Sequence, residues 1–170
     1  MTAPGERSNG YRLAFLAFGA GLATILGALG FEYIGGYVPC ELCLGQRVPY
    51  YAGLPLLGLL LIFWGRVPPK IRLVGTLVLA LVFVWSAWLG GYHAGVEWGL
   101  WPGPTACTGL GGDISFDALD SLDALRIVPC DQPQFRFLGI SFAGYNALIS
   151  LLVAAVLFLS ARAQAQKSAA

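Results

Sequence analysis

The chain has 170 residues, of which 57% are hydrophobic and only 11% are charged, and its formal net charge is +1. Soluble domains carry about 25% charged residues, so this composition indicates a protein whose main solvent is lipid. The basic residues form no run or stripe, and the charge therefore gives no reason to expect a nucleic-acid partner. We expect one membrane domain covering residues 1–170.

Four apolar stretches follow one another along the chain, at about 13–31, 48–64, 73–92 and 137–159. Each is close to the roughly 17 to 25 residues that an α-helix needs to cross a bilayer. The sequence therefore predicts an all-α membrane protein, a bundle of four transmembrane helices with both termini on one side. A cleaved signal peptide is the alternative for the first stretch, but its apolar run exceeds the roughly 7 to 15 residues typical of such a signal.

The distribution of charge predicts the orientation of this bundle. Seven of the ten basic residues lie beside the termini or between the second and third stretches, whereas eight of the nine acidic residues lie in segments 32–47 and 93–136. Short loops rich in Lys and Arg stay in the cytoplasm. We therefore expect cytoplasmic termini, with segments 32–47 and 93–136 on the outer side.

All four cysteines, Cys40, Cys43, Cys107 and Cys130, fall in these two outer segments, which is an oxidising location in most cells. Four cysteines allow three pairings, and the spacing does not choose among them. Disulfides that only staple the loops are one interpretation, and a zinc site with four thiolates is another. The Cys-Glu-Leu-Cys pair closes a very small ring, which favours thiol exchange over stapling.

The residues after this pair suggest what it reacts with. If the second helix begins near Cys43, Gln46 and Arg47 lie on the same face as its sulfur. A helix N-terminus and a guanidinium both stabilise a thiolate, so we expect Cys43 to be the more acidic thiol and Cys40 the more accessible one. Gln46 and Arg47 also suit the carbonyl of a quinone that enters from the lipid, with the Cys43 thiolate as its electron donor.

Several residues of the outer half have two interpretations. His93, the only histidine, is a candidate proton donor to reduced quinone or an ordinary interfacial residue, and Glu97 has the same two interpretations. Asn146 is expected to hydrogen-bond across helices. Residues 103–112, around Cys107, predict an exposed loop, and 114–128 predict a short amphipathic helix on the outer surface. An interfacial aromatic belt is expected from Trp85, Trp88, Tyr92, Trp98, Trp101, Tyr33, Tyr37, Tyr50 and Tyr51.

Three blocks in order resemble the disulfide bond formation protein B (DsbB) family, the quinone-dependent thiol oxidases of the bacterial inner membrane. They are Pro39–Arg47 (PCELCLGQR), Tyr92–Cys107 (YHAGVEWGLWPGPTAC) and Pro129–Asn146 (PCDQPQFRFLGISFAGYN). The resemblance implies a periplasmic location for the cysteines. It also implies a DsbA-like thioredoxin-fold partner and either ubiquinone or menaquinone as cofactor, and we expect no metal.

The same resemblance assigns roles to the cysteines. It implies that Cys107 and Cys130 form the disulfide that oxidises the partner, with Cys107 in the mixed disulfide. Cys130 would then pair transiently with Cys40 and release Cys43 beside the quinone, where Arg47 matches the family's quinone-site arginine. The alternatives are a non-catalytic four-span protein with stapled loops, a vitamin K epoxide reductase type of oxidoreductase, and a specialised relative that serves one dedicated partner.

Overall fold

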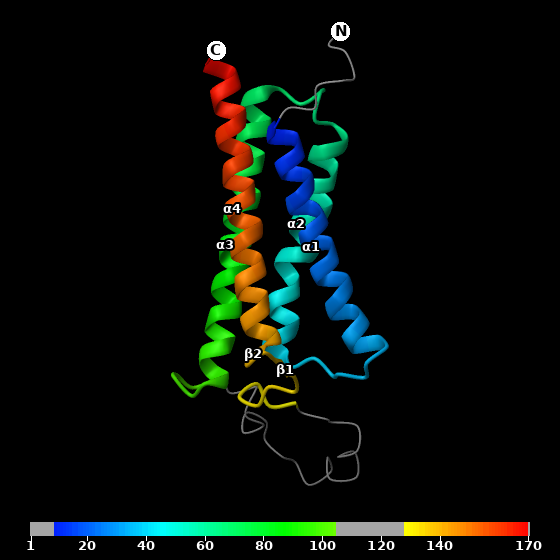
Figure 1. Cartoon of the computed structure of the whole chain (residues 1–170), viewed down its shortest axis with the longest axis vertical. Coiled ribbons are helices and arrows are strands. Elements are labelled where there is room, and N and C mark those ends of the chain that lie inside the picture. The colour runs from blue at the N-terminus through cyan, green and yellow to red at the C-terminus, as the bar shows by residue number, and fades with distance from the viewer. Residues whose placement is uncertain (1–8, 105–127, 170) are drawn as a thin grey trace, which may run out of the picture.

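The computed structural model describes residues 9–104 and 128–169, which form four α-helices and one small sheet. The helices run along the long axis of the molecule, and α1 begins and α4 ends at the same end (Figure 1). The sheet lies at the opposite end, which we call the loop end. The elements are α1 (Asn9–Tyr33), α2 (Glu41–Ile62), α3 (Pro69–Glu97), β1 (Arg136–Phe137), β2 (Ile140–Ser141) and α4 (Phe142–Ala169).

The predicted all-α class is confirmed for the described residues, and three of the helices are long and apolar enough to cross a membrane. These are α1, α3 and the part of α4 from Phe142 to Gln166. α2 does not meet the same criterion of length and hydropathy. Its first two turns carry Glu41, Gln46 and Arg47, and its apolar part is correspondingly short. The described part of the chain thus contains three candidate membrane spans among its four helices.

Two helix boundaries differ from the prediction. α2 begins at Glu41 rather than near Cys43, because Cys40 acts as its N-cap. The fourth helix was expected from residue 137, but β1 and β2 form an antiparallel hairpin there instead. Leu138 (φ 50°) and Gly139 (φ 81°) form its turn in the left-handed region, which a right-handed helix does not include.

α3 and α4 make the most extensive contact in the bundle. Gly90 of α3 lies directly against α4, since a Cβ atom built there would be only 2.7 Å from the backbone nitrogen of Ala147. Glycine therefore allows the two backbones to approach closely, as is common between membrane helices. The core includes the fully buried side chains of Phe83, Leu57 and Leu157.

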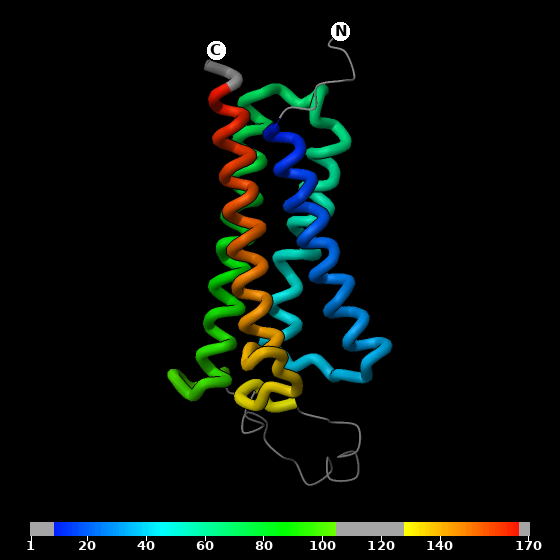
Figure 2. Tube along the Cα trace, in the orientation of Figure 1, coloured from blue at the N-terminus to red at the C-terminus, as the bar shows by residue number. Residues whose placement is uncertain are grey.

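α1 leans away from the other helices towards the loop end, and the chain then crosses below it to α2 (Figure 2). On α3, the rings of Trp85, Trp88 and Tyr92 stack along the outside of the bundle, with centroids 4.8 and 5.8 Å apart. Trp85 and Trp88 are exposed, as expected of belt residues, whereas Tyr50 is fully buried and does not belong to a belt. The expected amphipathic helix at 114–128 and the loop around Cys107 lie almost wholly outside the described residues.

Candidate functional site

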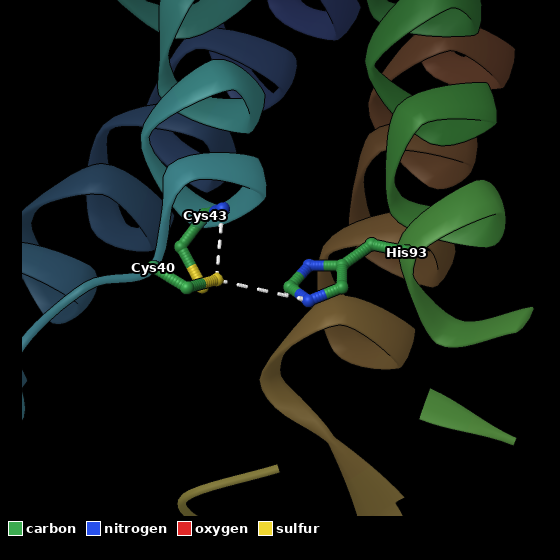
Figure 3. Close-up of side chains that lie close together, drawn as sticks. All are labelled: Cys40, Cys43 and His93. Atoms are coloured by element: carbon green, nitrogen blue, oxygen red, sulfur yellow. Dashed lines mark hydrogen bonds between the residues drawn. The ribbon is translucent and has the colours of Figure 1, made fainter. Parts of the chain in front are cut away.

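Cys40 and Cys43 meet at the N-terminus of α2. The backbone of Cys40 is extended, with φ −75° and ψ 171°, and its Sγ accepts a hydrogen bond from the Cys43 N–H at 3.2 Å. The unpaired N–H groups of a helix N-terminus carry a partial positive charge, which favours a thiolate at Cys40. The two sulfur atoms lie next to each other and face His93 of α3 (Figure 3). Both are free thiols, whereas Cys130 is in a disulfide.

The relative acidity of the two thiols is the reverse of the prediction, because Cys40 rather than Cys43 has the lower pKa. The Cys43 thiol donates a hydrogen bond to the Cys40 sulfur, and this bond makes the largest contribution to lowering the pKa of Cys40 to about 5. Burial acts in the opposite direction, and His93 lowers the pKa further. The same bond, together with burial, raises the pKa of Cys43. Cys40 is also the more buried of the two. Because Cys40 is the N-cap and Cys43 follows it in the first turn of the helix, the Cys43 thiol is placed as a donor to the Cys40 sulfur, and the Cys43 N–H adds a smaller contribution of the same sign.

His93 connects the thiols to the rest of the bundle. Its ring is buried, with Nε2 3.8 Å from Cys40 Sγ and 3.2 Å from the carbonyl oxygen of Cys130. Its Nδ1 lies 2.6 Å from Nε2 of Gln46. Because an amide nitrogen only donates, Nδ1 is the acceptor and the ring proton is on Nε2, directed towards Cys40 and Cys130.

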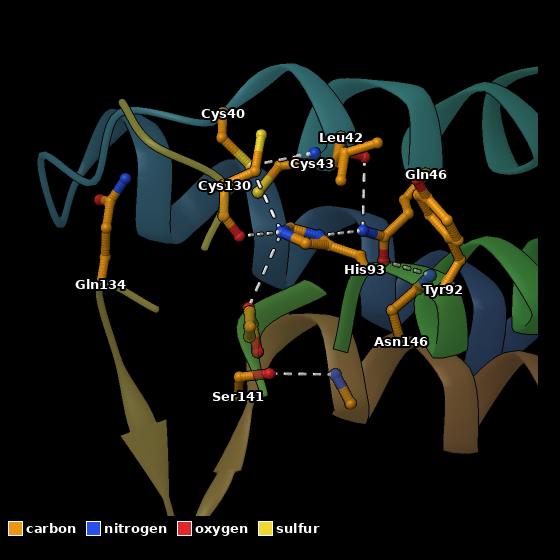
Figure 4. A network of polar contacts seen from close by, with 12 residues as sticks. Cys40, Leu42, Cys43, Gln46, Tyr92, His93, Cys130, Gln134, Ser141 and Asn146 are labelled. Carbon is orange, nitrogen blue, oxygen red and sulfur yellow. Dashed lines mark hydrogen bonds and ion pairs between the residues drawn. The ribbon is translucent and has the colours of Figure 1, made fainter. Parts of the chain in front are cut away.

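The orientation of the Gln46 amide depends on its other partners. Gln46 donates from Nε2 to the Leu42 carbonyl at 3.3 Å and accepts at Oε1 from Nδ2 of Asn146 at 2.8 Å. These contacts place the amide nitrogen on the side of His93 (Figure 4). The predicted hydrogen bond of Asn146 across helices is therefore confirmed, and its partner is a residue of the site.

The network continues from Asn146 towards the middle of the bundle. Tyr50 donates its hydroxyl proton to Asn146 Oδ1 at 2.9 Å and lies 2.7 Å from the Ser150 hydroxyl. Ser150 in turn donates to the Ser86 hydroxyl at 3.0 Å. α2, α3 and α4 thus share one chain of hydrogen bonds that ends at the thiols.

Glu97 is one helical turn beyond His93, and its Oε1 lies 3.8 Å from Nε2 of that ring. Its side chain is only 4% exposed, and within the described part of the chain its Oε2 has no hydrogen-bond partner. A buried carboxylate oxygen without a partner is costly, and such atoms are rare outside functional sites.

A cavity of about 500 Å³ opens beside the thiols, lined by α1, α2, α4 and the segment that leads from Val128 to the hairpin. Most of its wall is apolar, including Ile25 and Phe31 of α1 and Phe142 of α4. Its polar residues lie at the loop end, where it reaches the two cysteines. These polar lining residues include Cys40, Cys43, Gln46, Arg47, His93, Glu97 and Glu32.

Arg47 faces Glu32 across this cavity. The guanidinium forms an ion pair with the Glu32 carboxylate, which links α2 to the last turn of α1, and both side chains are largely buried. Ion pairs shielded from water are screened less by salt than exposed ones. Arg47 is therefore held in the cavity wall as a fixed positive charge.

All the predicted site residues of the first pair and of the quinone site come together here: Cys40, Cys43, Gln46, Arg47 and His93 line one cavity. Cys130 packs against Cys40 in one buried cluster. Cys107 lies outside the described residues. Sequence reasoning missed the roles of Glu32 and Tyr50, whose partners are distant in the chain. It considered Glu97 without connecting it to His93, although the four-residue spacing on a helix placed the two together.

The cavity suits a flat, mainly apolar molecule that carries an electronegative oxygen, as a quinone does. Its apolar walls match a ring and its substituents, and Arg47 and Gln46 provide polar groups at the end that reaches the thiols. The donor set of Cys40, Cys43 and His93 also has the character of a ligand set for a thiophilic metal.

Comparisons with known proteins agree with the cysteine pattern. The family model described as "Disulfide bond formation protein DsbB" matches residues 10–160. A protein of Rickettsia prowazekii (strain Madrid E), named "Uncharacterized protein RP370", is 31% identical over 127 residues, which cover 71% of this chain and 69% of that protein. No solved structure matches the chain significantly.

Proposed function

The chain belongs to the disulfide bond formation protein DsbB family, and from this we propose that it oxidises the dithiol of a DsbA-like periplasmic partner and passes the electrons to a membrane quinone. In this proposal α2 is a fourth span, the termini are cytoplasmic, and the cysteines face the periplasm of a bacterial inner membrane. The activity known in general for the family is thiol oxidation; its coupling to quinone in this chain is our proposal.

One observation carries the proposal. The free thiols of Cys40 and Cys43 lie in the wall of an apolar cavity that Arg47 also lines, and Cys130 packs against Cys40. A disulfide-bonded cysteine and a cavity that both border the same pair of thiols are the arrangement that a relay of electrons requires. Loops that are merely stapled need neither a cavity nor free thiols.

We propose that the resting protein carries Cys107–Cys130 and Cys40–Cys43 disulfides. A partner thiolate attacks Cys107 to form a mixed disulfide, and the released Cys130 thiolate attacks Cys40, which releases Cys43. The partner's second thiol then closes the partner's own disulfide and frees Cys107. The electron pair has now moved from the partner into this chain.

In the next step Cys107 attacks Cys130, which restores their disulfide and releases Cys40. A low pKa makes a thiolate a good leaving group, so the lowered pKa of Cys40, about 5, favours its release here. Free thiols at Cys40 and Cys43 together with a disulfide at Cys130, the combination found among the described residues, support this order of steps.

Cys40 and Cys43 then close to a disulfide and give up two electrons, for which a quinone held in the cavity would be the acceptor. Because Cys40 is already a thiolate, Cys43 releases one proton in this step and the second proton that the acceptor needs comes from solvent. Arg47 holds a fixed positive charge where negative charge would develop, which preorganises the site electrostatically. His93 holds a proton on Nε2, facing the Cys40 sulfur, and Gln46 maintains that tautomer through Nδ1.

The test is quinone reduction by the purified full-length protein in detergent, with a reduced DsbA-like protein as electron donor. We expect turnover by wild type and a loss of at least ~10³-fold in both Cys43→Ser and Cys107→Ser, because each removes a sulfur that the relay needs. Glu41→Gln, which changes an exposed residue between the two cysteines, serves as the control and should retain turnover. An inert wild type, tested with ubiquinone and menaquinone analogues, would contradict the proposal.

A further inference from the structure

The two thiols and the His93 ring have the spacing of metal ligands. One ligand atom from each of Cys40, Cys43 and His93 lies within 4.8 Å of the other two, and Cys40 Sγ is 3.8 Å from His93 Nε2. With Zn–S bonds of about 2.3 Å and Zn–N bonds of about 2.0 Å, neighbouring S and N ligands of a tetrahedral zinc ion lie roughly 3.6 Å apart. The observed sulfur-to-nitrogen distance differs from this by a few tenths of an ångström.

Glu97 provides an independent indication of a ligand site beside the thiols. Its Oε1 is 3.8 Å from His93 Nε2, its side chain is 96% buried, and its Oε2 has no partner among the described residues. The carboxylate borders the same cavity as the thiols. Only Cys40, Cys43 and His93 lie within ligand distance of one another among the described residues, so Glu97, which lies beside His93 Nε2, would have to turn towards the ion to supply a fourth ligand.

We propose that, when Cys40 and Cys43 are reduced, they bind a thiophilic divalent cation such as Zn²⁺ together with His93 and Glu97. Binding releases the protons that remain on the two thiols and changes no oxidation state. In the disulfide form neither sulfur is a thiolate, so the site exists only in the reduced protein.

The residues around His93 are suited to this second role. Ligation requires a free electron pair on Nε2, which moves the ring proton to Nδ1. The Gln46 amide then turns its oxygen towards Nδ1 and gives up its hydrogen bond to the Leu42 carbonyl. The Asn146 amide turns with it to keep their mutual hydrogen bond, and the Tyr50 hydroxyl then accepts from Asn146 instead of donating to it. Metal-bound histidines generally donate their other N–H to such an acceptor, which orients the ring.

The consequence for electron flow rests on the proposed function. A thiolate whose electron pair is bound to zinc does not close to a disulfide, so the bound ion stops electrons from leaving the Cys40–Cys43 pair. The ion is thus an inhibitor that competes with the electron acceptor for the reduced site.

The binding test uses the full-length chain with Cys107→Ser and Cys130→Ser, so that only the first cysteine pair remains. Co²⁺ reports thiolate ligation by its absorption spectrum, and Zn²⁺ is measured by competition with a chromophoric chelator. We expect one ion per reduced chain and none after Cys40 and Cys43 are oxidised to a disulfide. X-ray absorption of the zinc-loaded chain should show two sulfur and two nitrogen or oxygen ligands.

Variants distinguish binding by all the proposed ligands from binding by the two thiols alone. His93→Ala and Glu97→Gln should each weaken Zn²⁺ binding by at least ~10-fold, the lower end of what disturbing a metal site costs. Glu41→Gln, an exposed carboxylate in the same turn as the thiols, should leave binding unchanged. The inference would be overturned if Zn²⁺ did not bind to the reduced chain, or if the coordination shell of the bound zinc contained no nitrogen or oxygen ligand. Unchanged affinity in His93→Ala would also overturn it.

The assay needs neither partner nor quinone, and its failure is therefore distinguishable from failure of the proposed function. Quinone turnover without zinc binding overturns the metal site alone. Zinc binding to a chain that reduces no quinone overturns the proposed function alone. In wild type that does both, Zn²⁺ should inhibit turnover, and uninhibited turnover at saturating Zn²⁺ overturns the inhibitory role.

Discussion

The bundle has a buried polar network at each of its ends, and the two are built differently. At the end where α1 begins, Gln164 donates from its amide to Thr76 at 3.0 Å and accepts from Arg72 at 3.2 Å. Arg72 also donates to the Trp64 carbonyl at 2.9 Å, and its guanidinium stacks over the Trp64 ring. No buried side-chain N or O in the described part of this end lacks a partner.

At the loop end the network is incomplete. Among the described residues it contains two free thiols, a carboxylate oxygen without a partner and a wall of the 500 Å³ cavity. A saturated network rigidifies a fold, whereas groups that the described residues leave unpaired beside a cavity are available to a bound ligand. The contrast assigns stability to one end and chemistry to the other, and substitutions at matched positions test that assignment.

The largest difference in quinone turnover is expected between substitutions of two arginines, Arg47 and Arg66. Arg47→Ala removes the fixed positive charge from the cavity and should lower kcat/KM for quinone by roughly 100-fold, as does loss of one electrostatic contact in other enzymes. Arg66→Ala, an exposed residue in the turn that follows α2, should leave kcat/KM unchanged. Steady-state quinone reduction measures both. Equal rates in wild type and Arg47→Ala would remove this residue from the site.

A smaller difference in turnover is expected between two amides of α4, the partly buried Asn146 and the buried Gln164. Asn146→Ala and Gln164→Ala should each lower the free energy of unfolding by about 1–3 kcal/mol, because both leave buried partners unsatisfied. Only Asn146→Ala should also slow quinone reduction, by about 10-fold, since it frees the Gln46 amide that orients His93. Thermal unfolding in detergent and turnover measured on the same preparations separate the effects. A turnover defect in Gln164→Ala would contradict the division between the ends.

The smallest expected effect is a shift in the pH at which the Cys40 thiolate becomes protonated. Because the pKa of Cys40 falls to about 5, reduced wild type should show thiolate absorbance that disappears as the pH is lowered through 5, and His93→Ala should shift this midpoint upwards. The pKa is lowered relative to the ordinary value of 9.0, so the thiolate stabilises the reduced fold fully above pH 9 and loses this contribution between pH 9 and pH 5. A midpoint near 9 in wild type would contradict the geometry at the N-cap.

The sequence predicted the bundle well, because long apolar runs have few alternatives to a helix. It predicted the wrong thiol as the acidic one, since the start of a helix depends on which residue caps it, and Cys40 takes that place ahead of Cys43. The start of α4 was also wrong, because the left-handed turn at Leu138 and Gly139 has no apolar signature.

Within the site, local spacing was informative and distant pairing was not. Gln46 and Arg47 were identified from their distance to Cys43, and the closeness of His93 and Glu97 follows from helical periodicity. The ion pair between Arg47 and Glu32 joins two helices, and neither residue's neighbours in the sequence indicate the other. The cavity is likewise lined by residues of all four helices, and how these helices pack is not encoded in the composition.

The most direct test of the account is a single turnover without any partner protein. The purified chain, with Cys40 and Cys43 reduced and Cys130 in its disulfide, is mixed anaerobically with a quinone, and the cysteines are then mapped by mass spectrometry. We expect one quinone to be reduced per chain and a new disulfide to form between Cys40 and Cys43. No quinone reduction, or oxidation that leaves Cys40 and Cys43 as thiols, would contradict the account.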